Sequence, residues 1–72
     1  MSDRITVTFN FEKTTSTNWF RPEVAANFIN GTVVALYDTN IPDGKYRIID
    51  RVIDFNHALD SIEELTIFLE RR

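Results

Sequence analysis

Cysteine is absent from this 72-residue chain, and glycine, proline and histidine are scarce. Without a thiol the chain can form neither a disulfide nor a thiolate zinc site. The two glycines, Gly31 and Gly44, are too few for a phosphate-cradling or dinucleotide-binding loop. The one histidine, His57, and the serines Ser16 and Ser61 stand in no recognisable nucleophile context. These absences predict a protein that is not an enzyme and that carries no cofactor.

The chain also lacks a long apolar run and an excess of positive charge. No segment is apolar over the length needed to cross a bilayer, and no apolar leader is visible, so we expect a soluble cytoplasmic protein with no membrane partner. Eleven Asp and Glu residues against eight Lys and Arg give a net charge of −3. Since affinity for nucleic acid comes mainly from Lys and Arg contacts with phosphate, no nucleic-acid partner is expected.

The length and the apolar content together indicate one small domain, residues 1–72, that needs help to cover its apolar side chains. A chain of this size buries only ~60 % of the surface that its unfolded form exposes. The apolar residues make up 43 % of the chain and include six Phe, two Tyr and one Trp. A small globule does not easily hide so many aromatic rings, so we expect a homodimer or an obligate partner surface.

The first strand is predicted over residues 4–12, where apolar and polar residues alternate without interruption. The apolar members of this pattern are Ile5, Val7, Phe9 and Phe11. A period of two is typical of a strand with one face on the core and the other in solvent. The next segment, residues 13–18, has no apolar side chain and is rich in Thr, so we expect an exposed loop there.

Residues 45–55 form the densest apolar segment and are expected to be the central strand, because β-branched side chains favour a strand over a helix. As a strand, this segment divides its apolar side chains between two covered faces, with Tyr46, Ile48 and Val52 on one and Ile49, Ile53 and Phe55 on the other. Another strand is predicted at residues 32–38. The turn 41–44, with Pro42 and Gly44, should join the two strands as an antiparallel hairpin.

Two helices are predicted on either side of this hairpin. Residues 22–30 begin with Pro at a first helical position and end just before Gly31. In the tail, Ser61 and Glu64 have capping-box spacing, and a helical apolar face is formed by Ile62, Leu65, Phe68 and Leu69. The alternation of Leu65, Ile67 and Leu69 leaves open a shorter helix at 58–64 followed by a last strand. The predicted fold is therefore α+β in the order β-α-β-β-α, with a short sheet containing antiparallel strands and covered on one face by two helices.

The segment Trp19-Phe20-Arg21 is the predicted anchor for a partner protein. Trp and Arg are the residue types that dominate binding hot spots. The alternative is that Trp19 and Phe20 close the core over the short helix. Acidic side chains are expected to steer a partner with a basic surface towards the chain; they are Asp50, Asp54, Asp60, Glu63 and Glu64.

Asp50, Asp54 and His57 form the one candidate set for a metal site or for acid/base catalysis. On a helix these side chains share a narrow face, which suits a divalent metal. On a strand, interleaved with Arg47 and Arg51, the two carboxylates form a solvated ion-pair surface worth ~0–1 kcal/mol per pair. A small metal-dependent enzyme is therefore only an alternative hypothesis.

The sequence favours a small, acidic, non-catalytic binding protein. It would act as a regulator or inhibitor by occupying a surface of a partner protein. In size and composition, and in nothing more specific, such a chain is typical of a phage or mobile-element accessory protein. The second hypothesis is a structural subunit that assembles with its own copies into a homo-oligomer.

Overall fold

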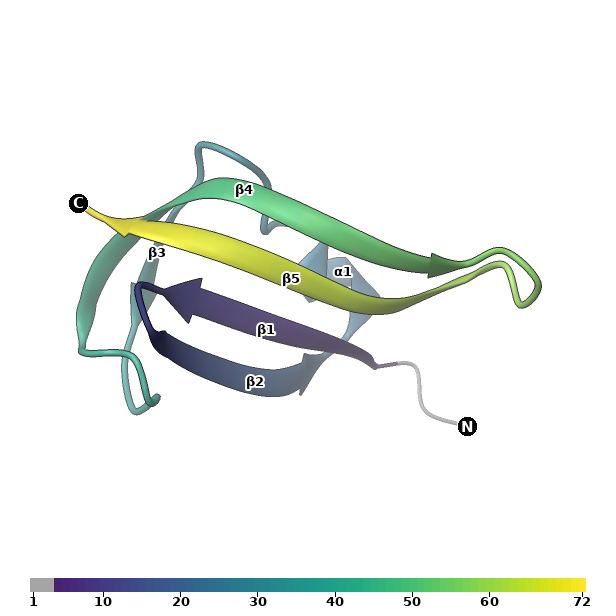
Figure 1. The fold of residues 1–72 in the computed structure, drawn as a ribbon, viewed down its shortest axis with the longest axis horizontal. Coiled ribbons are helices and arrows are strands. Elements are labelled where there is room, and N and C mark those ends of the chain that lie inside the picture. Colours follow the sequence, from purple (N-terminus) through teal and green to yellow (C-terminus); the bar gives the residue numbers. More distant parts are fainter. Residues whose placement is uncertain (1–3) are drawn as a thin grey trace.

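The computed structural model describes residues 4–72 and shows a mixed five-stranded sheet that curls into half of a barrel (Figure 1). The strands are β1 (Ile5–Phe11), β2 (Thr14–Phe20), β3 (Val33–Leu36), β4 (Gly44–Asn56) and β5 (Ser61–Arg71), and α1 (Pro22–Ala25) is a single helical turn. Their order across the sheet is β2-β1-β5-β4-β3. The central pair β1 and β5 is parallel, and the other neighbouring pairs are antiparallel.

The predicted α+β fold with two covering helices is wrong, because the first of these helices ends after one turn. The side-chain amide of Asn27 donates to the backbone carbonyls of Glu23 and Val24, at 3.2 and 3.3 Å. The Glu23 carbonyl is the acceptor that the Asn27 N–H needs in an α-helix. That N–H bonds to the Val24 carbonyl instead. A side chain that competes for backbone acceptors thus helps to stop the helix at its first turn.

The predicted C-terminal helix is also absent, and β5 stands in its place. Leu65, Ile67 and Leu69 are buried, whereas Ile62 and Phe68 are exposed, so the period of two prevails over the helical stripe. Hydrogen bonds to β1 on one side and β4 on the other hold this segment extended. The last strand of the open alternative is therefore present. Its short helix is not, because turns occupy residues 57–60 and β5 starts directly after them.

The loop predicted at residues 13–18 is mostly the edge strand β2, which pairs with β1 through a two-residue turn at Glu12 and Lys13. The hydroxyl oxygens of Thr8 and Thr17 lie 2.9 Å apart across the pair. Threonine is β-branched and polar, which suits an edge strand whose outer face meets water.

The predictions for the first strand and for the antiparallel hairpin of residues 32–38 and 45–55 are confirmed, but the prediction that residues 45–55 are the central strand is wrong, because β5 lies in the middle of the sheet and β4 next to the edge strand β3. Val7 and Phe9 of β1 point into the core, and β3 pairs antiparallel with the first residues of β4. The turn between β3 and β4 is held from inside, because the buried Tyr46 hydroxyl donates to the carbonyl of Pro42.

A bulge at Ile49 decides which side chains of β4 share a face. Ile48 lies opposite Leu69, but the next pair along the strands is Asp50 and Phe68, so Ile49 is the extra residue. Beyond the bulge Ile53 lies opposite Leu65. Since Leu65 and Leu69 share a face of β5, Ile53 shares the face of Ile48. The predicted division, which put Val52 with Ile48, is therefore wrong, and only one face of β4 meets the core.

The core fills part of the concave face of the curled sheet. Phe28, in the segment after α1, packs edge-to-face against Phe9 and Phe20, with ring centroids 5.3 and 5.6 Å apart. The buried residues of the core are Val7, Phe9, Ala25, Leu36, Ile41, Tyr46, Ile48, Leu65, Ile67 and Leu69. On β4 the core stops at Ile48, although the strand continues to Asn56. More than half of this strand therefore extends past the packed interior.

Candidate functional site

The far half of the β4–β5 hairpin reaches beyond the other strands, along the longest dimension of the molecule (Figure 1). β3 pairs with β4 only as far as Arg47, and β1 pairs with β5 only from Glu64 onwards. The hairpin between these points has no neighbouring strand within residues 4–72. We call residues 50–64 the distal hairpin.

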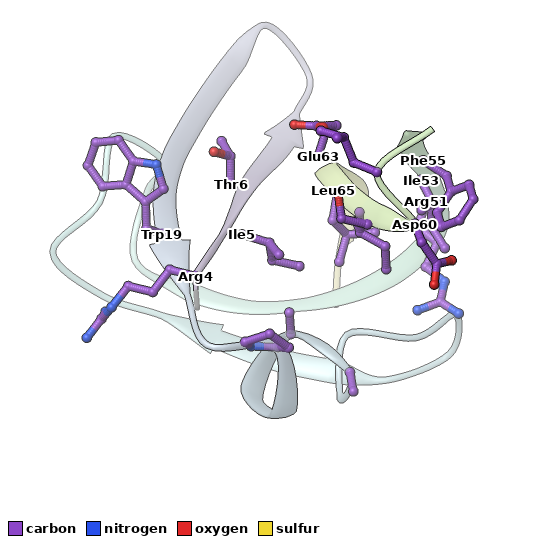
Figure 2. A pocket seen from close by; sticks show the side chains of 16 residues that line it. Arg4, Ile5, Thr6, Trp19, Arg51, Ile53, Phe55, Asp60, Glu63 and Leu65 are labelled. Carbon is purple, nitrogen blue, oxygen red and sulfur yellow. The ribbon is translucent and has the colours of Figure 1, made fainter. Parts of the chain in front are cut away.

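A groove of about 860 Å³ opens beneath the distal hairpin. Figure 2 shows Trp19 and Arg4 on one side, Ile53 and Phe55 on the other, and Ile5 between them. From the hairpin, four apolar side chains line the groove, Ile53, Phe55, Leu59 and Ile62, together with Arg51, Asp60, Ser61 and Glu63. We call the four apolar side chains the apolar wall. Ala25 of α1 and Leu65 of β5 also line it. The groove therefore continues the concave core face into a region that no element of the described chain fills.

The apolar side chains of this wall are about half exposed. The exposed fractions are 46 % for Ile53, 52 % for Phe55, 67 % for Leu59 and 41 % for Ile62. Apolar surface left in water forgoes about 25 cal/mol for each Å² that burial would remove. A contiguous apolar patch on a groove, rimmed by polar groups, is typical of a surface that another molecule covers.

The negative charge of the chain is concentrated on the same hairpin. Residues 50–64 contain five carboxylates and one arginine, a net charge of −4, whereas the whole chain carries −3, so the remaining residues sum to +1. Asp54 and Glu64 lie opposite each other on β4 and β5, and Asp60 and Glu63 line the groove. The arginine, Arg51, donates to the carbonyl of Phe28 at 3.2 Å. The groove is thus an apolar surface with an acidic rim.

The structure separates the three residues of the predicted anchor. Trp19 is 63 % exposed and stands at the rim of the groove. Phe20 points into the core against Phe9, as its alternative role required. Arg21 is exposed, with its Nε 3.7 Å from a carboxylate oxygen of Glu23. Only Trp19 shares a surface with the distal hairpin, and partner binding by these residues stays a prediction.

The acidic residues Asp50 and Asp54 do not form a metal site with His57. The Asp50 carboxylate accepts the backbone N–H of Arg51 at 2.8 Å. The ring of His57, in the turn after β4, packs edge-to-face near that of Phe55, with centroids 6.5 Å apart. In the part of the chain that the structure describes, no group of three or more His, Asp or Glu side chains is placed to hold a metal ion.

Sequence reasoning missed the apolar wall because it assigned Ile53 and Phe55 to a covered face and Ile62 to a helix. The one sequence signal that could have found it is Leu59, which stands between Ala58 and Asp60 in a segment with turn residues on both sides. A large apolar residue in a turn has no core of its own to enter, so it points to an exposed patch.

Comparisons of the chain with protein-family models, with curated proteins and with solved structures find no match. Within residues 4–72 there is also no helix with the length and apolar character needed to cross a membrane. The function is therefore inferred from the groove and from the charge around it.

Proposed function

We propose that this chain is a small non-catalytic protein-binding module that acts in the cytoplasm as a regulator or inhibitor, and that the groove receives its partner. The observation that carries the proposal is the half-exposed apolar wall on a hairpin that the other residues of the described range 4–72 leave uncovered. An apolar centre with a charged rim is the usual anatomy of a protein interface. Trp19 at the rim supplies an aromatic side chain of the kind that anchors such interfaces.

Because the rim of the groove is acidic, we expect the partner to have a complementary basic surface. A charge of −4 on residues 50–64 attracts a basic partner over about a Debye length, ~8 Å at physiological salt. Such attraction raises the association rate more than it strengthens the final complex. Binding is therefore expected to slow when salt is added, while the apolar wall holds the complex once it has formed.

Two neighbouring residues of β4 offer a matched test. Ile53 lines the groove and is 46 % exposed, whereas Val52 lies on the opposite face and is 48 % exposed. Tagged wild type, Ile53→Asn and Val52→Asn would be incubated with lysate of the source cell, and retained proteins identified by mass spectrometry. A protein retained by wild type and Val52→Asn but lost by Ile53→Asn supports the proposal. Equal retention by all three forms, or retention by none, contradicts it.

A self-assembling subunit is the second candidate function, and a second apolar patch favours it. Ile49, Val52 and Phe68 are 50, 48 and 38 % exposed on the outer side of the sheet, and Phe68 lies opposite Asp50 next to the bulge. Two copies meeting through this patch would form a homodimer and leave both grooves open. Sedimentation equilibrium tests this candidate: a dimer that Val52→Asn dissociates supports it, and a monomeric wild type at high concentration rules it out.

A further inference from the structure

The outer edge of β4 is free over the same residues that form the groove wall. The Gly31 N–H donates to the Ile48 carbonyl and the Ile48 N–H to the Thr32 carbonyl, at 2.8 and 2.9 Å. After Ile48 no strand of the described chain lies on that side. Beyond Ile48, the backbone N–H of Arg51 bonds to the carboxylate of Asp50.

The last five residues of this edge lack the features that commonly prevent strand addition. Natural edge strands are protected by lysine, by proline, by β-bulges or by inward-pointing charges. The bulge at Ile49 and Arg51, whose side chain lines the groove, come just before this stretch. From Val52 to Asn56, β4 has no lysine, proline, inward-pointing charge or extra residue, and its inward-facing side chains are Ile53 and Phe55. A stretch of backbone with unpaired N–H and C=O groups and an apolar inner face is a template for a strand from another chain.

The two faces of β4 determine the sequence that such a strand would need. Its side chains next to Ile53 and Phe55 would enter the groove, so apolar residues are favoured there. On the other face they would lie next to Asp50, Val52 and Asp54, and near Glu64 across from Asp54, so lysine or arginine is favoured beside the carboxylates. Because successive side chains of a strand alternate between faces, the fitting sequence alternates apolar and basic residues.

A second copy of this chain does not meet that requirement. Pairing two distal hairpins would bring together two surfaces of charge −4. The chain has one short stretch that alternates basic and apolar residues, Lys45 to Ile48. That stretch already lies between β3 and β5. The charge therefore selects a different, basic occupant.

We propose that the groove is occupied by an extended segment of a partner protein, with alternating apolar and basic residues, which adds to the free edge of β4 as a sixth strand. The inference rests on the proposed function and specifies its partner. Backbone hydrogen bonds to β4 provide the register, apolar side chains fill the groove, and lysine or arginine side chains meet the carboxylates on the outer face.

A synthetic peptide tests this proposal without knowledge of the partner. The probe is an acetylated and amidated octapeptide of four Val-Lys repeats, and its control has the same composition in the order Val-Val-Lys-Lys repeated twice. Each is titrated into the ¹⁵N-labelled full chain. The alternating peptide is expected to shift and protect backbone amides of Arg51, Ile53 and Phe55, and to leave the β2 edge unchanged. The control peptide should bind at least ten-fold more weakly.

Charge variants add a second readout. Asp54→Asn is expected to weaken binding of the alternating peptide about two- to five-fold, the range for one exposed ion pair. Asp43→Asn, in the turn at the opposite end of β4, should leave the affinity unchanged.

Three outcomes overturn the proposal: no binding of the alternating peptide, equal binding of the two peptides, or amide protection on β2 instead of β4. Self-association of the chain through β4, strengthened by Asp54→Asn, would also overturn it, because the occupant would then be a second copy. The proposed function is tested by a different experiment, the retention of a partner from lysate. If Ile53→Asn loses a protein that Val52→Asn retains, the groove binds protein even when the octapeptide does not bind.

Discussion

Truncation of two isoleucines of β4 is expected to lower the free energy of unfolding by different amounts, although both side chains lie on the same face of the strand. Ile48 is fully buried in the core, and Ile53 is 46 % exposed in the groove. Ile48→Ala removes buried carbon atoms and leaves a cavity, at a cost of ~2–5 kcal/mol in the free energy of unfolding. Ile53→Ala gives up only part of that burial and opens no enclosed cavity, so its cost should be about 1 kcal/mol.

The expected difference in the free energy of unfolding between Ile48→Ala and Ile53→Ala is large relative to the stability of the molecule. A core of this size rarely supplies more than ~3–5 kcal/mol, so Ile48→Ala should leave much of the chain unfolded at room temperature. The free energy of unfolding of both variants is measured by urea denaturation, followed by far-ultraviolet circular dichroism, at two protein concentrations that differ ten-fold. An Ile53→Ala cost equal to that of Ile48→Ala, growing with concentration, would show that a second copy already covers the groove and would refute the reasoning.

Two further predictions concern the turns and loops that hold the half-barrel. Tyr46→Phe removes the hydrogen bond to the Pro42 carbonyl and should lower the free energy of unfolding by ~0.5–1.5 kcal/mol, measured by the same denaturation; no change would mean that water replaces the hydroxyl. Gly31→Ala should cost ~1–2 kcal/mol through the backbone alone, because φ is +92° and no atom lies within 4 Å of the added Cβ; a neutral result in thermal unfolding would contradict that backbone conformation.

Strict alternation of apolar and polar residues was enough to predict β1. The turn residues near Pro42 were enough to predict that the strands on either side of them form a hairpin. The tail was harder, because Ile62, Leu65, Phe68 and Leu69 fit a helix while Leu65, Ile67 and Leu69 fit a strand. Pairing with β1, more than 50 residues earlier in the chain, decides between them. The local sequence of the tail does not show which distant strand it will pair with. In this segment, tertiary contacts decide between helix and strand, and the intrinsic propensity does not.

Other errors had local causes that are visible only in three dimensions. The side chain of Asn27 takes a backbone acceptor and ends the predicted helix. β2 was predicted as a loop because its threonines lack apolar alternation, although they suit an edge strand. The extra residue Ile49 changes the face of every later side chain of β4, and no sequence signal marks that bulge.

The candidate site was predictable in its charge and only partly in its apolar side chains. The acidic cluster from Asp50 to Glu64 was identified from the sequence, and Trp19 does reach the groove. The apolar wall was not predicted, because Phe55 and Ile62 become neighbours only when β4 and β5 pair. A site that arises from the pairing of two strands appears in the sequence as two separate core segments.

Hydrogen exchange along the outer edge of β4 tests the central claim most directly. The backbone amides of Ile53 and Phe55, which alternate along β4 with amides that bond to β5, would be compared in the isolated chain and in its complex with the protein that Val52→Asn retains and Ile53→Asn loses. The account predicts fast exchange in the isolated chain and slow exchange in the complex, with the β2 edge unchanged. Slow exchange of these two amides in the isolated chain, or no change in their exchange on binding, would contradict an open groove whose edge binds a partner.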